Sequence, residues 1–143
     1  KYLRPSFNAR SKQKEKNKPE QLPPRSYTSS DGLEILVGRN NKQNDKLTLK
    51  QAAENDIWLH TKDIPGSHVI IRLNGLEEVP ERTLTEAAAL AAFYSKASSS
   101  DNVPVDYTRV NQVKKPAGAL PGKVIYFQQK TLFVTPSKLK ENK

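Results

Sequence analysis

The chain has 143 residues, with 24 Lys and Arg against 15 Asp and Glu, and a formal net charge of +9. This length suits one domain with tails, and the lack of cysteine excludes disulfides, thiolate metal sites and cysteine nucleophiles. No apolar run approaches the roughly 20 residues that a membrane span needs. Because the chain contains no methionine, we expect Lys1 to be an internal residue of a longer polypeptide.

The positive charge is concentrated near the N-terminus. Residues 1–25 carry eight Lys or Arg against two acids, whereas residues 26–137 carry thirteen basic and twelve acidic residues. Polyanion binding by the folded part therefore requires a local basic patch. Residues 1–30, rich in Lys, Pro, Asn and Gln, predict a basic linker or arm, and plain disorder is the alternative interpretation. We expect the domain to span 31–137 and residues 138–143 to form a basic tail.

The first elements of the predicted domain are a strand, a short helix and a hairpin. Residues 33–37 (LEILV) predict the strand, and Asn44 or Asp45 is expected to cap a short helix through residues 46–54. Two apolar runs, residues 57–60 and 68–73, predict a hairpin with a tight turn at Pro65 and Gly66.

Residues 83–97 predict the main helix. Thr83 and Glu86 have the spacing of a capping box, and the many alanines let this helix lie close to a sheet. Residues 103–110, 123–129 and 131–136 predict strands, the last two joined by a hairpin turn at 129–131. The expected fold class is α+β, a mostly antiparallel or mixed β-sheet packed against one main helix plus a short helix.

The only tryptophan and both histidines lie in residues 56–71 (DIWLHTKDIPGSHVII). In a strand over residues 56–60, Ile57 and Leu59 share the inward face, and Trp58 and His60 share the other face. An outward Trp58 beside His60 can stack an RNA base. The alternative is that a neighbouring loop or helix covers Trp58.

The sequence gives little support for a metal site or for the active site of a hydrolase. Two histidines without cysteine fall short of the three or four ligands that zinc requires, although Asp63 can add an oxygen to His60 and His68. Ser67 and His68 are adjacent, so on a strand they point to opposite faces and cannot pair as nucleophile and base. We expect no catalytic residues, no metal and no cofactor. A metal-dependent nuclease or hydrolase is the enzymatic alternative.

Two polar segments are the remaining candidates for a binding surface. Residues 38–45 (GRNNKQND) follow a predicted strand, and residues 106–123 (DYTRVNQVKKPAGALPGK) contain no acid after Asp106. Such stretches can neutralise phosphates while Tyr107 supplies a ring. The alternative interpretation is an ordinary solvated loop. The basic residues of the second segment are Arg109, Lys114, Lys115 and Lys123.

Four ordered motifs resemble the C-terminal R domain of the NFACT proteins, ribosome quality-control factors that are also called fibronectin-binding protein A. These motifs are residues 37–45 (VGRNNKQND), 56–71, 82–98 (RTLTEAAALAAFYSKAS) and 113–127 (VKKPAGALPGKVIYF). The resemblance runs from about Asp31 to Pro136. It implies that residues 1–30 follow the family's coiled coil, in the same parent polypeptide.

The resemblance implies a non-enzymatic, cytoplasmic RNA-binding module. In this family the full-length protein binds the obstructed large ribosomal subunit and recruits charged tRNA, alanyl-tRNA in bacteria, so that the stalled chain gains a C-terminal tail. The expected partners are therefore large-subunit rRNA and tRNA. The alternative is an adhesin-type fibronectin-binding module with cell-surface association.

The motifs and the basic segments together define the residues expected at the RNA surface. Asp45, Asp56, Gly66 and Gly122 also fall in the motifs, and Asp45 is expected to cap a helix or to orient Arg39. The expected RNA contacts are Arg39, Asn40, Asn44, Trp58, His60, Lys62, His68, Tyr107, Arg109, Lys114 and Lys115.

Overall fold

A computed structural model describes residues 22–143, which form an α+β fold, as the sequence predicts. A six-stranded sheet has the order β2-β3-β5-β4-β6-β9, with every neighbouring pair antiparallel. Its strands are β2 (Arg25–Thr28), β3 (Glu34–Val37), β4 (Ile57–Thr61), β5 (Val69–Ile71), β6 (Val103–Arg109) and β9 (Lys130–Val134). The other elements are α1 (Asn41–Lys46), the π-helix η2 (Leu47–Gln51), α2 (Glu81–Phe93), the 3-10 helix η3 (Val110–Gln112), β7 (Val113–Lys114) and β8 (Ile125–Tyr126).

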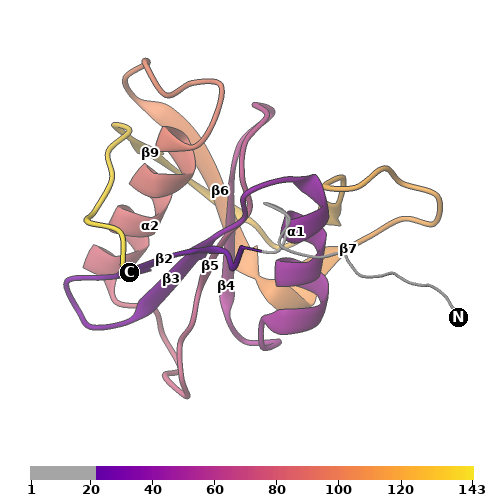
Figure 1. The fold of residues 1–143 in the computed structure, drawn as a ribbon, viewed down its shortest axis with the longest axis horizontal. Helices are drawn as coiled ribbons and strands as arrows, with labels where there is room; N and C mark the ends of the chain where they lie inside the picture. Colours follow the sequence, from indigo (N-terminus) through magenta and orange to yellow (C-terminus); the bar gives the residue numbers. More distant parts are fainter. Residues whose placement is uncertain (1–21) are drawn as a thin grey trace, which may run out of the picture.

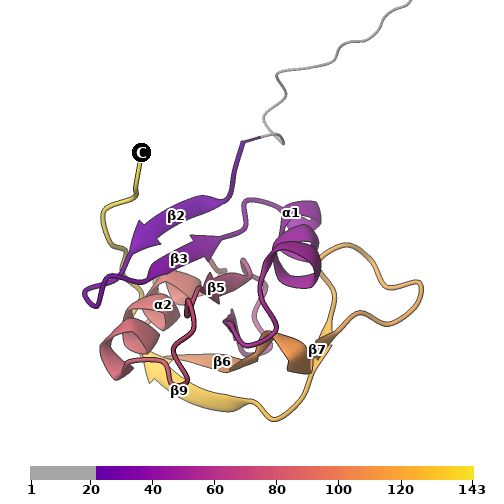
Figure 2. The same cartoon turned by 90° about the horizontal axis from the view of Figure 1, so that it is seen from below.

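The two faces of the curved sheet are covered by different elements (Figures 1 and 2). Helix α2 lies against one face, and α1, η2 and the β7–β8 ribbon lie on the other. Strand alternation separates the cores, since Ile57 and Leu59 face α2 whereas Trp58 and Ile70 face the opposite layer. Among residues 22–143, no helix is long and apolar enough to cross a membrane.

Helix α2 begins two residues earlier than the predicted capping box. Pro80 is the N-cap residue and makes no side-chain cap bond. Thr83 instead donates to the carboxylate of Asp31 at 2.8 Å, and Glu86 accepts from the backbone N–H of Ser30 at 2.8 Å. The capping-box prediction is wrong because these side chains hold the turn between β2 and β3 against the helix.

The predicted hairpin of β4 and β5 is confirmed, with Trp58 opposite Ile70. Its turn differs from the prediction, because the chain reverses at Lys62 and Asp63, and Asp63 has a φ of 55°. Gly66 instead pairs with Ser95 at the end of α2. A Cβ at Gly66 would lie 2.8 Å from the Ser95 Cβ, so close packing, rather than turn conformation, requires this glycine.

Helix α1 also begins earlier than predicted. Its cap is Asn40, whose side chain accepts from the backbone N–H of Gln43 at 2.9 Å, so Asn44 and Asp45 both lie inside the helix. Asn44 is buried, and its Oδ1 accepts from the backbone N–H of His68 at 3.2 Å. A Cβ on Gly38 would lie 1.8 Å from that oxygen, so this glycine makes room for Asn44.

The last strands do not form the hairpin predicted at residues 129–131. β8 pairs with β7, with Val113 opposite Tyr126, while β9 pairs with β6 and forms the edge of the six-stranded sheet. The buried carboxylate of Asp106 accepts hydrogen bonds from the hydroxyls of Tyr126 and Thr131. That polar link ties both strands to β6 and not to each other.

The described structure extends across both boundaries expected for the domain. β2 and β3 form a hairpin that crosses residue 31, and the C-terminal segment lies along β2. There the Asn142 N–H donates to the Ser26 carbonyl at 2.7 Å. Most of the predicted basic arm, residues 1–21, lies outside the described residues.

Candidate nucleic-acid interface

A groove of about 1020 Å³ runs beside α1, where the helix faces the loop of residues 115–123. Its cations are Lys42 and Lys46 of α1 and Lys123 of the loop. None of its lining residues within 22–143 is acidic, and we call it the lysine groove. Amide and apolar side chains complete the wall, among them Asn40, Asn41, Gln43, Leu22 and Leu120.

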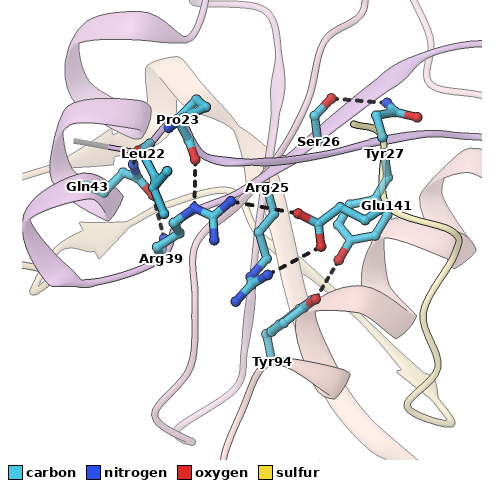
Figure 3. Close-up of polar contacts among 10 residues, drawn as sticks. Leu22, Pro23, Arg25, Ser26, Tyr27, Arg39, Gln43, Tyr94 and Glu141 are labelled. Atoms are coloured by element: carbon cyan, nitrogen blue, oxygen red, sulfur yellow. Dashed lines mark hydrogen bonds and ion pairs between the residues drawn. The ribbon is translucent and has the colours of Figure 1, made fainter. Parts of the chain in front are cut away.

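One wall of the lysine groove is the segment Leu22 to Pro24, which is fastened to the start of α1 (Figure 3). Arg39 Nε donates to the Pro23 carbonyl at 2.7 Å, and Gln43 Nε2 donates to the Leu22 carbonyl at 2.8 Å. The Gln43 Oε1 also accepts from the Arg39 backbone N–H at 2.7 Å. Arg39 therefore supports one wall of the lysine groove by holding the segment Leu22 to Pro24 in place.

The opposite wall is a loop closed by Lys115. Its Nζ donates to the carbonyls of Leu120 and Lys123 at 2.6 and 3.1 Å, and lies 3.2 Å from the carboxylate of Asp45. Asp45 also accepts from the Gly122 N–H at 3.0 Å. Asp45 thus neither caps α1 nor orients Arg39, because its carboxylate ties the helix to this loop.

A second basic feature is the pair formed by Arg25 and Arg39 at one end of the sheet. Glu141 lies between them, 3.3 Å from Arg25 and 3.7 Å from Arg39 (Figure 3). Both arginine side chains are partly exposed, at 35% and 24%. The C-terminal segment therefore supplies the anion that faces these two cations.

An aromatic pocket of about 430 Å³ adjoins the lysine groove and is lined by Trp58, His60, His68 and Tyr126. The His60 ring is stacked on Trp58, with centroids 5.9 Å apart and planes 5° apart. Tyr126 lies 4.6 Å from Trp58 between centroids. Trp58 is only 1% exposed, so its own surface is covered, and of the two alternatives for this residue the structure shows the covered one.

His68 supports the aromatic pocket from within. Its Nε2 donates to the Gly122 carbonyl at 3.3 Å, which leaves Nδ1 to accept from the Thr48 hydroxyl at 2.9 Å. Burial, with help from the neighbouring His60, lowers the pKa of His68 to about 4. Burial also lowers the pKa of His60. His68 is therefore neutral at pH 7, and neither of its nitrogens is left for a metal.

The predicted residues separate onto two faces. Tyr107 and Arg109 lie on the α2 side of β6, where Arg109 donates to the carbonyls of Asn55 and Glu77, each at 2.6 Å. Lys62 lies on the other face, 3.8 Å from Asp106, with a side chain that is 45% exposed. The structure thus does not bring Tyr107 and Arg109 to the lysine groove.

The burial of the predicted residues further divides them. Asn44 and His68 are 3% and 1% exposed, so they present almost no surface and serve as supports. Lys114 is exposed on β7. Sequence reasoning missed Lys42 and Lys46, although their i, i+4 spacing marks one face of a helix. In residues 22–143, no three His, Asp or Glu side chains are grouped so that they can hold a metal ion.

Comparisons with known proteins place this architecture among relatives. The family model described as the NFACT protein RNA binding domain matches residues 24–127. A Bacillus subtilis protein named Rqc2 homolog RqcH is 55% identical over 136 residues, which are 95% of this chain and 23% of that protein. The Streptococcus suis Rqc2 homolog RqcH is 49% identical over 115 residues, 80% of this chain and 20% of that protein. The chain thus spans less than a quarter of the length of these relatives.

A solved structure shares the fold. It is described as the C-terminal part of the fibronectin/fibrinogen-binding protein from Streptococcus suis, and matches with a TM-score of 0.77 and 47% identity. The match covers 82% of this chain and 47% of that one. At this identity the agreement concerns sequence as well as fold.

Proposed function

Because the chain belongs to the family of NFACT protein RNA-binding domains, we propose that it binds RNA as a module of a ribosome quality-control factor. The observation that carries this proposal is the lysine groove, with three cations and no acid among its lining residues in the described part of the chain. Phosphate contacts of this kind dominate the affinity of proteins for nucleic acids. The amides of the groove can hydrogen-bond sugars and base edges.

The charge of the lysine groove distinguishes it from the other hollows. A hollow of about 780 Å³ beside Arg72 and Arg109 is lined by the acids Glu54, Asp56 and Glu77. Those carboxylates repel phosphate and offset the two arginines. A polyanion therefore favours the face that carries α1 and the loop of residues 115–123.

Within this function we propose rRNA of the obstructed large ribosomal subunit and tRNA as the partners, and the cytoplasm as the place of action. Two further related proteins are named ribosome quality control complex subunit NEMF homolog, from Drosophila melanogaster, and ribosome quality control complex subunit 2, from Schizosaccharomyces pombe. The module would help the rest of its parent polypeptide, including a coiled coil, to support C-terminal tailing of stalled chains. Peptide-bond formation would belong to the ribosome, so the module needs no catalytic residue.

The combined variant Lys42→Ala, Lys46→Ala and Lys123→Ala is expected to weaken RNA binding and to flatten its salt dependence. Each lost phosphate contact removes about one unit from the slope of log affinity against log salt, so the slope should fall by up to about 3. Fluorescence anisotropy with a labelled rRNA fragment between low and physiological salt measures both quantities. A control variant, Arg82→Ala, Lys96→Ala and Lys130→Ala, removes the same charge from exposed positions outside the groove. Equal losses in the two variants would contradict the proposal.

Glu141→Gln is expected to strengthen RNA binding by about two- to fivefold and to steepen its salt dependence. The change removes the anion between Arg25 and Arg39, and an exposed ion pair is worth up to about 1 kcal/mol. The same anisotropy titration measures the gain. Glu81→Gln, which changes the same charge at the exposed start of α2, is the control and should have a smaller effect. A similar gain in both would show that only net charge matters.

Fibronectin binding is the competing function, motivated by the name of the structural relative. Two measurements separate the two candidates, namely surface-plasmon resonance against immobilised fibronectin and co-sedimentation with large ribosomal subunits. Ribosome association without fibronectin affinity supports the RNA-binding proposal. Tight fibronectin binding without ribosome association would replace it.

A further inference from the structure

The aromatic pocket has the form of a stacking site. The His60 ring lies parallel to Trp58 on one side and, unlike Trp58, is itself partly exposed. Tyr126 is fixed as a second wall because its hydroxyl donates to the buried Asp106 carboxylate at 2.7 Å. A flat ring placed on His60 would extend the Trp58–His60 stack by one member. The pocket's volume of about 430 Å³ lies within the range of small-ligand sites, about 300–1,000 Å³.

The polar groups of the aromatic pocket suit a neutral heterocycle. Burial lowers the pKa of both His60 and His68, so both imidazoles favour the uncharged form at pH 7, and a neutral ring can stack on His60. The buried indole N–H of Trp58 has no hydrogen-bond partner within the described chain. Such unmet donors are rare in folded proteins, and this one belongs to a pocket-lining residue.

The aromatic pocket adjoins the lysine groove. Asn41 and Lys123 line both hollows. A strand whose phosphates follow Lys42, Lys46 and Lys123 would therefore pass the mouth of the pocket. The Asp63 carboxylate can accept a hydrogen bond from the edge of a base, and the Asn41 amide can accept or donate one. Duplex RNA, in contrast, keeps its bases paired and out of reach.

We propose that the aromatic pocket binds one unpaired nucleobase, stacked on His60, while Lys123 holds an adjacent phosphate. This inference rests on the proposed RNA binding and specifies which part of the RNA the module recognises. It makes His60 a contact residue and Trp58 the ring that supports it. It also gives the module a preference for single-stranded or bulged RNA over a continuous duplex.

The chain's single tryptophan allows a direct test, since a nitrogen-15 NMR spectrum contains one indole N–H signal. The whole chain is titrated with a ten-nucleotide single-stranded RNA, and with the same RNA in which the bases are replaced by abasic sites. Anisotropy follows the saturation of each. The normal RNA is expected to shift the indole signal, and the abasic RNA is expected to leave it near its free position.

Variants then distinguish this pocket from general phosphate binding. His60→Ala is expected to weaken binding of the normal RNA about tenfold, in line with the loss of one base-stacking contact, and to leave binding of the abasic RNA unchanged. Phe133→Ala, which removes an exposed and uncharged ring outside both hollows, is the matched surface control. The indole signal of His60→Ala in the absence of RNA shows whether the fold around Trp58 is intact.

Each outcome decides between the two proposals. Saturable RNA binding with an unmoved indole signal, or equal losses of both RNAs in His60→Ala, overturns the base pocket and leaves RNA binding by the lysine groove in place. Absence of binding by either RNA at low salt overturns both proposals. A base-dependent indole shift that disappears in His60→Ala supports the base pocket.

Discussion

Trp58→Ala is expected to lower the free energy of unfolding by about 3–5 kcal/mol, the typical cost of truncating a buried large aromatic side chain. Trp58 is 1% exposed and is the largest fully buried side chain of the described core. Its cluster on this face of the sheet consists of Leu47, Ile70, Val110 and Val113. Because that cluster is small, removal of the Trp58 indole leaves a cavity that few neighbouring side chains can fill.

Urea denaturation followed by circular dichroism measures this loss, since the variant has no tryptophan fluorescence. Trp58→Phe is the matched comparison, because it keeps a ring against Ile70 and Tyr126 and should lose less than half as much. The unpaired indole N–H means that this replacement breaks no hydrogen bond within the described structure. A loss below about 1 kcal/mol for Trp58→Ala would show that the residue does not hold the α1 layer to the sheet.

Acidification from pH 7 to pH 4 is expected to lower the free energy of unfolding by about 3 kcal/mol through His68 alone. Its pKa falls from 6.5 to about 4 in the folded chain, mainly because the ring is buried. Between these values the unfolded chain binds more protons than the folded chain, so stability decreases as pH falls through this window. Above about pH 6.5 this contribution is constant.

His68→Gln isolates that contribution from the carboxylates that also titrate in acid. Glutamine cannot take up a proton, yet its amide can donate to the Gly122 carbonyl as His68 does. The wild-type and variant curves of unfolding free energy against pH should therefore converge below pH 6.5. Parallel curves between pH 7 and 4 would mean that His68 has an ordinary pKa and that its surroundings admit water.

The sequence predicts which β4 side chains lie on the same face of the sheet, and it predicts helix α2. Alternation predicts that Ile57 and Leu59 share a face, and the alanines of α2 predict close packing on a sheet; both are confirmed. These are local properties of the chain, because strand and helix periods follow from backbone geometry. The family motifs, likewise, are visible in order along the chain.

The site depended on contacts between distant segments, and no local rule predicts them. The sequence predicts that Lys115 contacts RNA. In the structure its ammonium group instead pairs with Asp45, 70 positions earlier in the chain, and donates to a carbonyl of its own loop. Thr83 has the local pattern of a cap, but the fold brings Asp31 to its hydroxyl. A side chain hydrogen-bonds to the best partner that the folded chain supplies, which can outcompete the nearest partner in sequence.

Sequence patterns suffice to predict the α+β class, the hairpin of β4 and β5 and the family. The burial of Trp58, the contact of Arg39 with Glu141 and the common groove of Lys42, Lys46 and Lys123 are seen only in the folded chain. The physical reason is that strand and helix patterns arise from neighbours within a few residues. A cationic groove beside an aromatic pocket arises where α1 and the loop of residues 115–123 meet, more than 60 residues apart along the chain.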